Sequence, residues 1–148
     1  IICDATHRET YDILNGKLKR NDFMPFAPAV LEEDANVLFQ VDKSPHTAEF
    51  MTMLYDTQEE WADKLPTVTH PVDKTARIQI VKQVNNQWFW EILKEYKNRT
   101  GIGCLVNTSF NVHNEPIVNH PGEAFRHLRS GIIDYLVTPY GIFSLADQ

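Results

Sequence analysis

The sequence has little that suggests a membrane, a secreted scaffold or a nucleic-acid partner. None of its apolar runs approaches the roughly 20 residues that a membrane-spanning helix needs. Its two cysteines, Cys3 and Cys104, are too few for a disulfide framework or a zinc cluster and are typical of reduced intracellular thiols. The formal net charge of −6 argues against a general nucleic-acid binder, because such proteins present a basic face. We therefore expect a cytoplasmic protein that contacts no membrane.

Common nucleotide-binding and metal-binding motifs are also missing. The sequence has no G-x-x-x-x-G-K-[ST] loop and no G-x-G-x-x-G motif, so a nucleotide site here is neither a P-loop nor a Rossmann site. The six histidines show no paired spacing such as H-x-x-x-H, and we predict no metal ligands. The chain begins without an initiator Met or a basic leader, which predicts a fragment of a longer protein.

The length of 148 residues fits one domain, 1–148, which is large enough to bury a core. The Pro25–Pro28 segment predicts a rigid, extended stretch. Apolar spacing and terminal signals, such as a capping box at Thr6 and Glu9, predict the regular elements. The expected helices are 7–19, 31–39, 86–99 and 121–131, and the expected strands are 50–55, 76–81, 102–106, 134–137 and 141–145. Interspersed helices and strands of this kind predict an α/β or α+β fold with a mixed sheet.

Two basic stretches are candidates for anion binding. Lys17, Lys19 and Arg20 precede the proline segment and are suited to clamping phosphate oxygens, or else they complement the dipole at the end of their helix. The stretch Thr69–Arg77 is a polar turn that runs into a strand. Arg77 is therefore placed either to hold a phosphate or carbonyl oxygen or to pair with a surface carboxylate.

The most informative stretch is Asn107–Asn111, where an apolar strand ends abruptly in polar side chains. Ligands of open α/β sheets often bind beyond the carboxyl ends of strands, and these hydroxyl and amide groups offer hydrogen bonds to phosphate, ribose or a carbamoyl group. The alternative is a turn in which Asn and Ser bond their own backbone. Ser109 lacks a G-x-S-x-G context and is not interpreted as a nucleophile.

Four motifs in order carry a family resemblance over nearly the whole chain: MPFAPAVLEE (Met24–Glu33), THPVDKTARIQ (Thr69–Gln79), NTSFNVHNEPIV (Asn107–Val118) and PGEAFRHLRSGIIDYLV (Pro121–Val137). The chain resembles the carboxy-terminal domain of O-carbamoyltransferases of the nodulation-factor, cephamycin and tobramycin type. The resemblance implies a YrdC-like α/β fold, with a twisted open mixed sheet and flanking helices. It also implies that this domain makes carbamoyl adenylate from carbamoyl phosphate and ATP, with Mg²⁺ delivered by the ATP.

In that family a separate amino-terminal, ASKHA-like domain holds a metal and transfers the carbamoyl group to a hydroxyl of a small-molecule or glycan acceptor. The resemblance implies that this chain lacks that domain and is slightly truncated before Ile1. The site residues that we predict are Lys19, Arg20, Arg77 and Ser109 as catalytic residues, and Lys17, His70, Thr75, Asn107, Thr108, Phe110 and Asn111 as ligands of ATP and carbamoyl phosphate.

Some points of this resemblance stay open. Lys17 and Lys19 are both candidates for the family lysine, because Leu18 disturbs the spacing. Met24 stands where many members have Arg, and Asn114 replaces a common Gly, which predicts a strained turn. Two other functions are an RNA-binding YrdC-like module and a non-catalytic docking domain, the latter supported by Met24.

Overall fold

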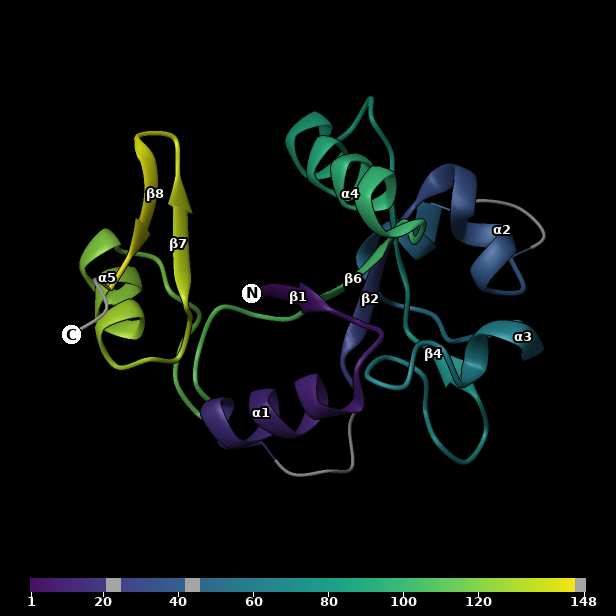
Figure 1. The fold of residues 1–148 in the computed structure, drawn as a ribbon, viewed down its shortest axis with the longest axis horizontal. Coiled ribbons are helices and arrows are strands. Elements are labelled where there is room, and N and C mark those ends of the chain that lie inside the picture. Colours follow the sequence, from purple (N-terminus) through teal and green to yellow (C-terminus); the bar gives the residue numbers. More distant parts are fainter. Residues whose placement is uncertain (21–24, 42–45, 146–148) are drawn as a thin grey trace.

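The centre of the molecule is a four-stranded mixed sheet with the strand order β1-β6-β2-β5. The computed structural model describes residues 1–20, 25–41 and 46–145. The strands are β1 (Ile2–Asp4), β2 (Ala27–Leu31), β5 (Gln79–Val81) and β6 (Cys104–Asn107). β6 runs antiparallel to β1 and β2, whereas β2 and β5 are parallel. This arrangement, visible in Figure 1, confirms the predicted α/β class with an open mixed sheet and flanking helices.

Helices cover both faces of this sheet. On one face, Leu14 and Leu18 of α1 (Arg8–Leu18) share a buried cluster with Val30 and Val106. On the other face, Leu93 of α4 (Gln87–Thr100) packs with residues that alternate with these along the strands. They are Ala29, Leu31, Val81 and Leu105. Because successive side chains of a strand point to opposite faces, the two clusters divide β2 and β6 between them, and both faces of the sheet are buried.

Several predicted elements are confirmed. α4 (Gln87–Thr100) begins at Asn86, whose side chain accepts a hydrogen bond from the amide of Phe89, and it ends at Gly101 with φ of 82°. α5 (Pro121–Arg129) begins at the predicted proline, and Gly131 follows it with φ of 72°. Strand β6 and the last two strands are also where they were predicted, as is a short helical stretch within 31–39. It comprises a 3-10 turn, Glu32–Asp34, and α2 (Ala35–Leu38).

The start of α1 differs from the prediction. The predicted capping box is wrong, because the N-cap residue is His7 and makes no side-chain capping bond. The Thr6 hydroxyl instead donates a hydrogen bond to the Asp4 carboxylate at 2.5 Å. The helix ends at Lys19, which adopts a left-handed conformation with φ of 54°.

The proline segment was predicted to be extended, and the structure makes it part of the central strand β2. Proline is rare in central strands because it has no amide hydrogen to donate. Pro28 lies opposite Val106 of β6, and the parallel pairing with β5 starts only at Ala29. Pro28 therefore sits where β2 has a ladder partner on one side only. Met24 lies outside the described residues.

Two predicted strands were wrong in extent. The stretch 50–55 contains the end of a 3-10 helix, His46–Phe50, and then Met51 with a left-handed φ of 56°. Only β3 (Tyr55–Asp56) pairs, with β4 (Thr75–Ala76). A left-handed residue interrupts an extended chain, which explains the failure of this apolar run as a strand. The strand predicted over 76–81 is likewise split into β4 and β5, with Arg77 between them.

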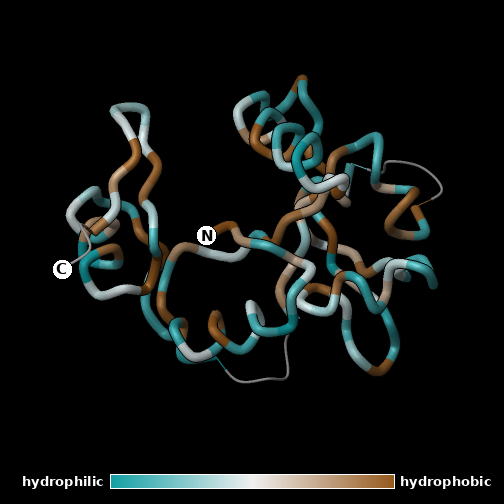
Figure 2. Tube along the Cα trace, viewed as in Figure 1, coloured by the Kyte–Doolittle hydropathy of each residue, from teal (hydrophilic) through white to brown (hydrophobic). Residues whose placement is uncertain are grey.

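The carboxy-terminal part of the described chain forms a unit of its own. α5 packs on a hairpin of β7 (Tyr135–Thr138) and β8 (Gly141–Ser144), which stands apart from the main sheet in Figure 1. Its core consists of Ala124, Leu128 and Leu136. Figure 2 shows hydrophobic residues along both strands of this hairpin. Among the described residues, no helix, including the short α3 (Glu59–Ala62), is long and apolar enough to cross a membrane.

Candidate functional site

A cavity of about 360 Å³ lies at one end of the main sheet. It forms where β6 ends at Asn107, opposite Ala27 at the start of β2. Arg77 stands two residues before β5, and Arg20 follows the end of α1. The cavity thus brings together three segments that lie far apart in the sequence. Six predicted site residues line it: Arg20, Arg77, Asn107, Thr108, Ser109 and Asn111.

The two arginines give the cavity its charge. The guanidinium of the half-buried Arg20 donates from Nη1 to the Thr108 hydroxyl at 3.0 Å and stacks 4.8 Å from the centre of the Phe26 ring. Burial lowers the pKa of Arg20, and the nearby positive charge of Arg77 lowers it further. Within the described part of the chain, neither guanidinium has a carboxylate within salt-bridge distance. Two adjacent cations without a carboxylate partner among the described residues are suited to binding an anion, although the protein as a whole is acidic.

The polar loop after β6 supplies hydrogen-bonding groups of two kinds. Asn111 is committed to the loop itself, since its Nδ2 donates to the backbone carbonyl of Glu115 at 2.8 Å. This matches the alternative interpretation of the stretch as a self-bonded turn. Ser109, by contrast, is exposed at the cavity, and its hydroxyl has no partner among the described residues. Its hydroxyl is therefore available to a ligand.

Five predicted site residues do not line the cavity: Lys17, Lys19, His70, Thr75 and Phe110. Lys17 forms an ion pair with Asp134 at 3.0 Å, toward the α5 unit. Lys19 is the exposed C-cap residue of α1. Phe110 packs against the core of the α5 unit, with its ring 5.4 Å from that of His127. Phe110 therefore anchors the loop, and of the three basic residues near the end of α1 only Arg20 reaches the cavity.

His70 and Thr75 belong to a turn beside the cavity. The Asp73 carboxylate accepts hydrogen bonds from the His70 ring at 2.9 Å and from the Thr75 hydroxyl at 2.8 Å. Hydrogen bonds from the backbone amide and hydroxyl of Thr75 lower the pKa of Asp73. This turn lines a second cavity of about 260 Å³, which shares Pro25 and Arg77 with the first. Arg77 therefore contacts both cavities.

Several residues at the site were not predicted from the sequence. Met51 and His113 line the cavity, and the amide of His113 donates to the Leu18 carbonyl at 2.9 Å. Gln79 contacts the site indirectly, because its Oε1 accepts a hydrogen bond from Asn107 Nδ2 at 2.7 Å. His113 and Gln79 both fall within the motifs quoted above, so the motifs themselves were an available signal. Asn114 has a left-handed φ of 68°, which fits the strain expected at that turn.

Comparison with known proteins identifies the family. The model of the carbamoyltransferase C-terminus family matches residues 1–143. The chain belongs to this family. It is 38% identical over 138 residues to nodulation protein NolNO of Sinorhizobium fredii, covering 93% of the chain and 20% of the relative. Nodulation protein NolO of Bradyrhizobium diazoefficiens is 36% identical over 138 residues, covering 93% of the chain and 25% of the relative. Nodulation protein U of Rhizobium tropici is 39% identical over 114 residues, covering 76% of the chain and 19% of the relative.

The chain spans about a fifth to a quarter of the length of these relatives. Full-length relatives therefore contain additional polypeptide beyond the part that matches. Carbamoyltransferases are transferases, so the family places the chain with group-transfer enzymes. The match covers all three segments that form the cavity, the end of α1, Arg77 and the loop after β6.

Proposed function

We propose that this chain binds ATP and carbamoyl phosphate and forms carbamoyl adenylate as part of a longer O-carbamoyltransferase. The observation that carries the proposal is the pair of arginines, Arg20 and Arg77, which have no carboxylate partner among the described residues. They lie at a cavity that also offers the Ser109 hydroxyl and the Asn107 amide. A family whose name denotes carbamoyl transfer, together with an anion site, supports carbamoyl phosphate and ATP as ligands.

The side chains at this cavity are suited to adenylate formation. Water first cleaves carbamoyl phosphate to carbamate and phosphate. A carbamate oxygen then attacks the α-phosphorus of ATP, and pyrophosphate leaves with the electrons of the broken P–O bond. The protein must hold two anions in line and neutralise the charge on the phosphoryl oxygens. Arg20 and Arg77 are suited to the second task, because guanidinium groups bind phosphate oxygens in a fixed, forked geometry.

Magnesium fits this site as a companion of the nucleotide. Among the described residues that line the cavity there is no carboxylate. Mg²⁺ would therefore be held by the phosphates of ATP and by water, as is usual when a protein offers no dedicated cage. Its contribution would be to neutralise phosphate charge. The chain's own contribution would be to bind and orient the two substrates with its arginines, Ser109 and Asn107.

The proposed ligand site is tested by titration calorimetry of the chain with ATP and Mg²⁺, and separately with carbamoyl phosphate. Arg77→Ala should weaken ATP binding by about 1.5–3 kcal/mol, the usual scale of a charged hydrogen bond. Lys17→Ala is the control, because Lys17 is a cation of α1 that is paired with Asp134 and does not line the cavity. Its ATP affinity should change less than about twofold, the scale of an exposed ion pair.

The same titrations separate the proposal from its alternatives. A non-catalytic docking domain would bind neither ATP nor carbamoyl phosphate. Unchanged ATP affinity in both Arg77→Ala and Arg20→Ala would overturn the assignment of the cavity. Carbamoyl transfer itself is measured on the full-length polypeptide, where the same two variants should lose activity in parallel with binding.

A further inference from the structure

We propose that Gln79 is a positioning residue, which fixes the amide of Asn107 so that its carbonyl oxygen accepts a hydrogen bond from the NH₂ of a carbamoyl group. This inference rests on the proposed function. The fixed amide lets the cavity select carbamoyl phosphate over another acyl phosphate of the same charge and shape.

The bond between these two residues crosses the central strand. Gln79 begins β5 and Asn107 ends β6, and β2 runs between them. Asn107 is paired with Ala27 and Gln79 with Ala29, yet Asn107 Nδ2 reaches Gln79 Oε1 at 2.7 Å. Neighbouring strands lie about 4.8 Å apart, so the two side chains together span roughly 10 Å of backbone separation.

Small residues on β2 allow this crossing. Ala29 packs with Val81 and Leu105, the residues two positions from Gln79 and Asn107 on their strands. Since side chains alternate along a strand, Gln79, Asn107, Ala27 and Ala29 all project from the same face of the sheet. Ala27 and Ala29 are buried, and their methyl groups leave the space that the two amides use.

The crossing decides which end of the Asn107 amide is free. An Asn side chain has a carbonyl acceptor and an NH₂ donor on the same carbon, and a bond to one end orients the other. Gln79 accepts from Nδ2, and it does not line the arginine cavity, whereas Asn107 does. Within the described part of the chain, Oδ1 of Asn107 has no hydrogen-bond partner. Asn107 therefore presents an acceptor to the ligand.

A hydrogen-bond acceptor at this position distinguishes a carbamoyl group from an acetyl group. The NH₂ of a carbamoyl group donates a hydrogen bond to it, whereas the methyl group of an acetyl group leaves it unpaired. A site that loses such a partner binds the analogue more weakly, because its desolvated polar group stays unsatisfied. The phosphate part of both ligands is the same, so the arginines do not contribute to this difference.

The test compares carbamoyl phosphate with acetyl phosphate on the 148-residue chain by calorimetry, using the ratio of the two affinities. The ratio should favour carbamoyl phosphate by about 5- to 10-fold, the scale of one hydrogen bond. Gln79→Leu should reduce it to below about 2-fold, because the Asn107 amide is then free to turn. Gln79→Glu should preserve the ratio, because a carboxylate only accepts and so holds Nδ2 in the same direction.

Gln83→Leu is the matched control, because it replaces the same amide side chain by leucine at an exposed position. Gln83 lies in the turn after β5 and does not line the cavity. Its ratio should equal that of the unchanged chain. Gln79→Met, whose side chain is closer in shape to glutamine, replaces the leucine variant if circular dichroism shows the latter to be unfolded.

The results separate this inference from the proposed function. An unaltered ratio in the folded Gln79→Leu or Gln79→Met chain overturns the role of Gln79, as does a ratio lost equally in Gln79→Glu. If the unchanged chain binds both acyl phosphates equally, and Arg77→Ala still weakens both, the selectivity is refuted and the anion site stands. If the unchanged chain binds neither acyl phosphate, the proposed function itself fails.

Discussion

The main sheet and the α5 unit bury their strands in different ways. The main sheet is covered on both faces, and every residue of β2 is buried. The hairpin of β7 and β8 is covered on one face only, by α5, where the rings of Phe125 and Phe143 meet at 5.1 Å. On its other face Tyr135, Val137 and Ile142 remain about two-thirds exposed. Mixed sheets buried on both faces are rigid platforms, whereas an isolated hairpin is marginal, and the cavity lies on the platform.

The loop after β6 connects these two regions. Thr108 at its start accepts the Arg20 hydrogen bond in the cavity, and Phe110, two residues later, packs in the core of the α5 unit. The ion pair between Lys17 and Asp134 makes a second link. The loop that offers Ser109 is therefore fixed at one end by the main sheet and at the other by the α5 unit.

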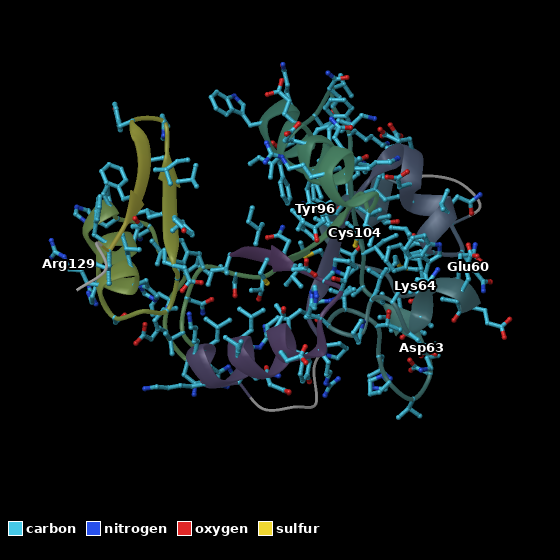
Figure 3. All side chains as sticks on the ribbon, in the orientation of Figure 1. Glu60, Asp63, Lys64, Tyr96, Cys104 and Arg129 are labelled. Carbon is cyan, nitrogen blue, oxygen red and sulfur yellow. The ribbon has the colours of Figure 1, made fainter. Side chains whose placement is uncertain are left out.

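The α5 unit lies at one end of the molecule. Figure 3 shows Arg129 of α5 and Glu60 of α3 at opposite ends.

The largest expected effect lies in the main sheet. Leu93 is fully buried against the strands, and Leu93→Ala should lower the free energy of unfolding by about 3 kcal/mol through lost burial and the cavity left behind. Chemical denaturation measures this change. Because the platform holds the cavity, the remaining folded fraction should still bind ATP. A change below about 1 kcal/mol would show that the second face of the sheet does not stabilise the fold.

A smaller and more local effect is expected in the α5 unit. Leu136→Ala removes one of the three residues at the centre of that core and should cost about 2 kcal/mol. Hydrogen exchange should become faster in 121–144, whereas the amides of β2 and β6 should keep their protection. Equal acceleration in both regions would show that they unfold as one unit, contrary to the comparison.

A third prediction concerns the attachment of α4 to the sheet and its dependence on pH. Partial burial raises the pKa of Asp4, but hydrogen bonds from Thr6 and Tyr96 outweigh it and bring the pKa to about 2. Because the folded pKa lies below the usual value of 3.8, this stabilisation is present above about pH 4 and is lost as the pH falls toward 2. In Figure 3 Tyr96 lies close to Cys104 of the sheet, and its hydroxyl donates to Asp4 at 2.7 Å.

Tyr96→Phe tests this attachment. It should cost about 1 kcal/mol at pH 7, the scale of one hydrogen bond, and should shrink the loss of stability between pH 4 and pH 2. Unfolding curves across this range measure both quantities. Tyr135→Phe is the control, since the exposed Tyr135 lies on the hairpin, and an identical pH profile in the two variants would contradict the role of Asp4.

The smallest effect is expected on the bare face of the hairpin. Ile142 is 70% exposed, so Ile142→Thr should change the free energy of unfolding by less than about 0.5 kcal/mol. Thermal unfolding measures this change. A loss as large as that of Leu136→Ala would mean that the hairpin face is covered, and that the two regions differ less than their exposure indicates.

Local signals predicted the elements that carry them. Asn86 with Gly101, and Pro121 with Gly131, mark the ends of two helices because capping depends on neighbouring residues alone. The central strand β2 was missed as a strand, since Pro28 is acceptable there only because of where the pairing with β5 starts. Such a register is a property of the assembled sheet.

In the site, too, some features follow from local sequence and others only from the assembled fold. Its residue types indicated an anion ligand, and Arg20, Arg77 and Ser109 do meet at one cavity. The lysines of the same stretch do not line it, because Lys17 pairs with Asp134 and Lys19 is the left-handed C-cap residue of α1. The bond from Asn107 to Gln79 joins residues 28 positions apart across a third strand, and no local pattern reports it. Met51, which lies outside the quoted motifs, reaches the cavity through a left-handed loop conformation that only the folded chain defines.

The opposite direction of β6 relative to β2 has a consequence for transplanting this site. The cavity takes one wall from the last residue of β6 and another from the first residues of β2 and the approach to β5. A peptide copied from 107–111, or that loop grafted onto a foreign scaffold, would carry the hydroxyl and amides without either guanidinium. Any recipient must supply three strand ends in the same order and offset, and a slip of β6 by a single residue would turn Asn107 to the opposite face.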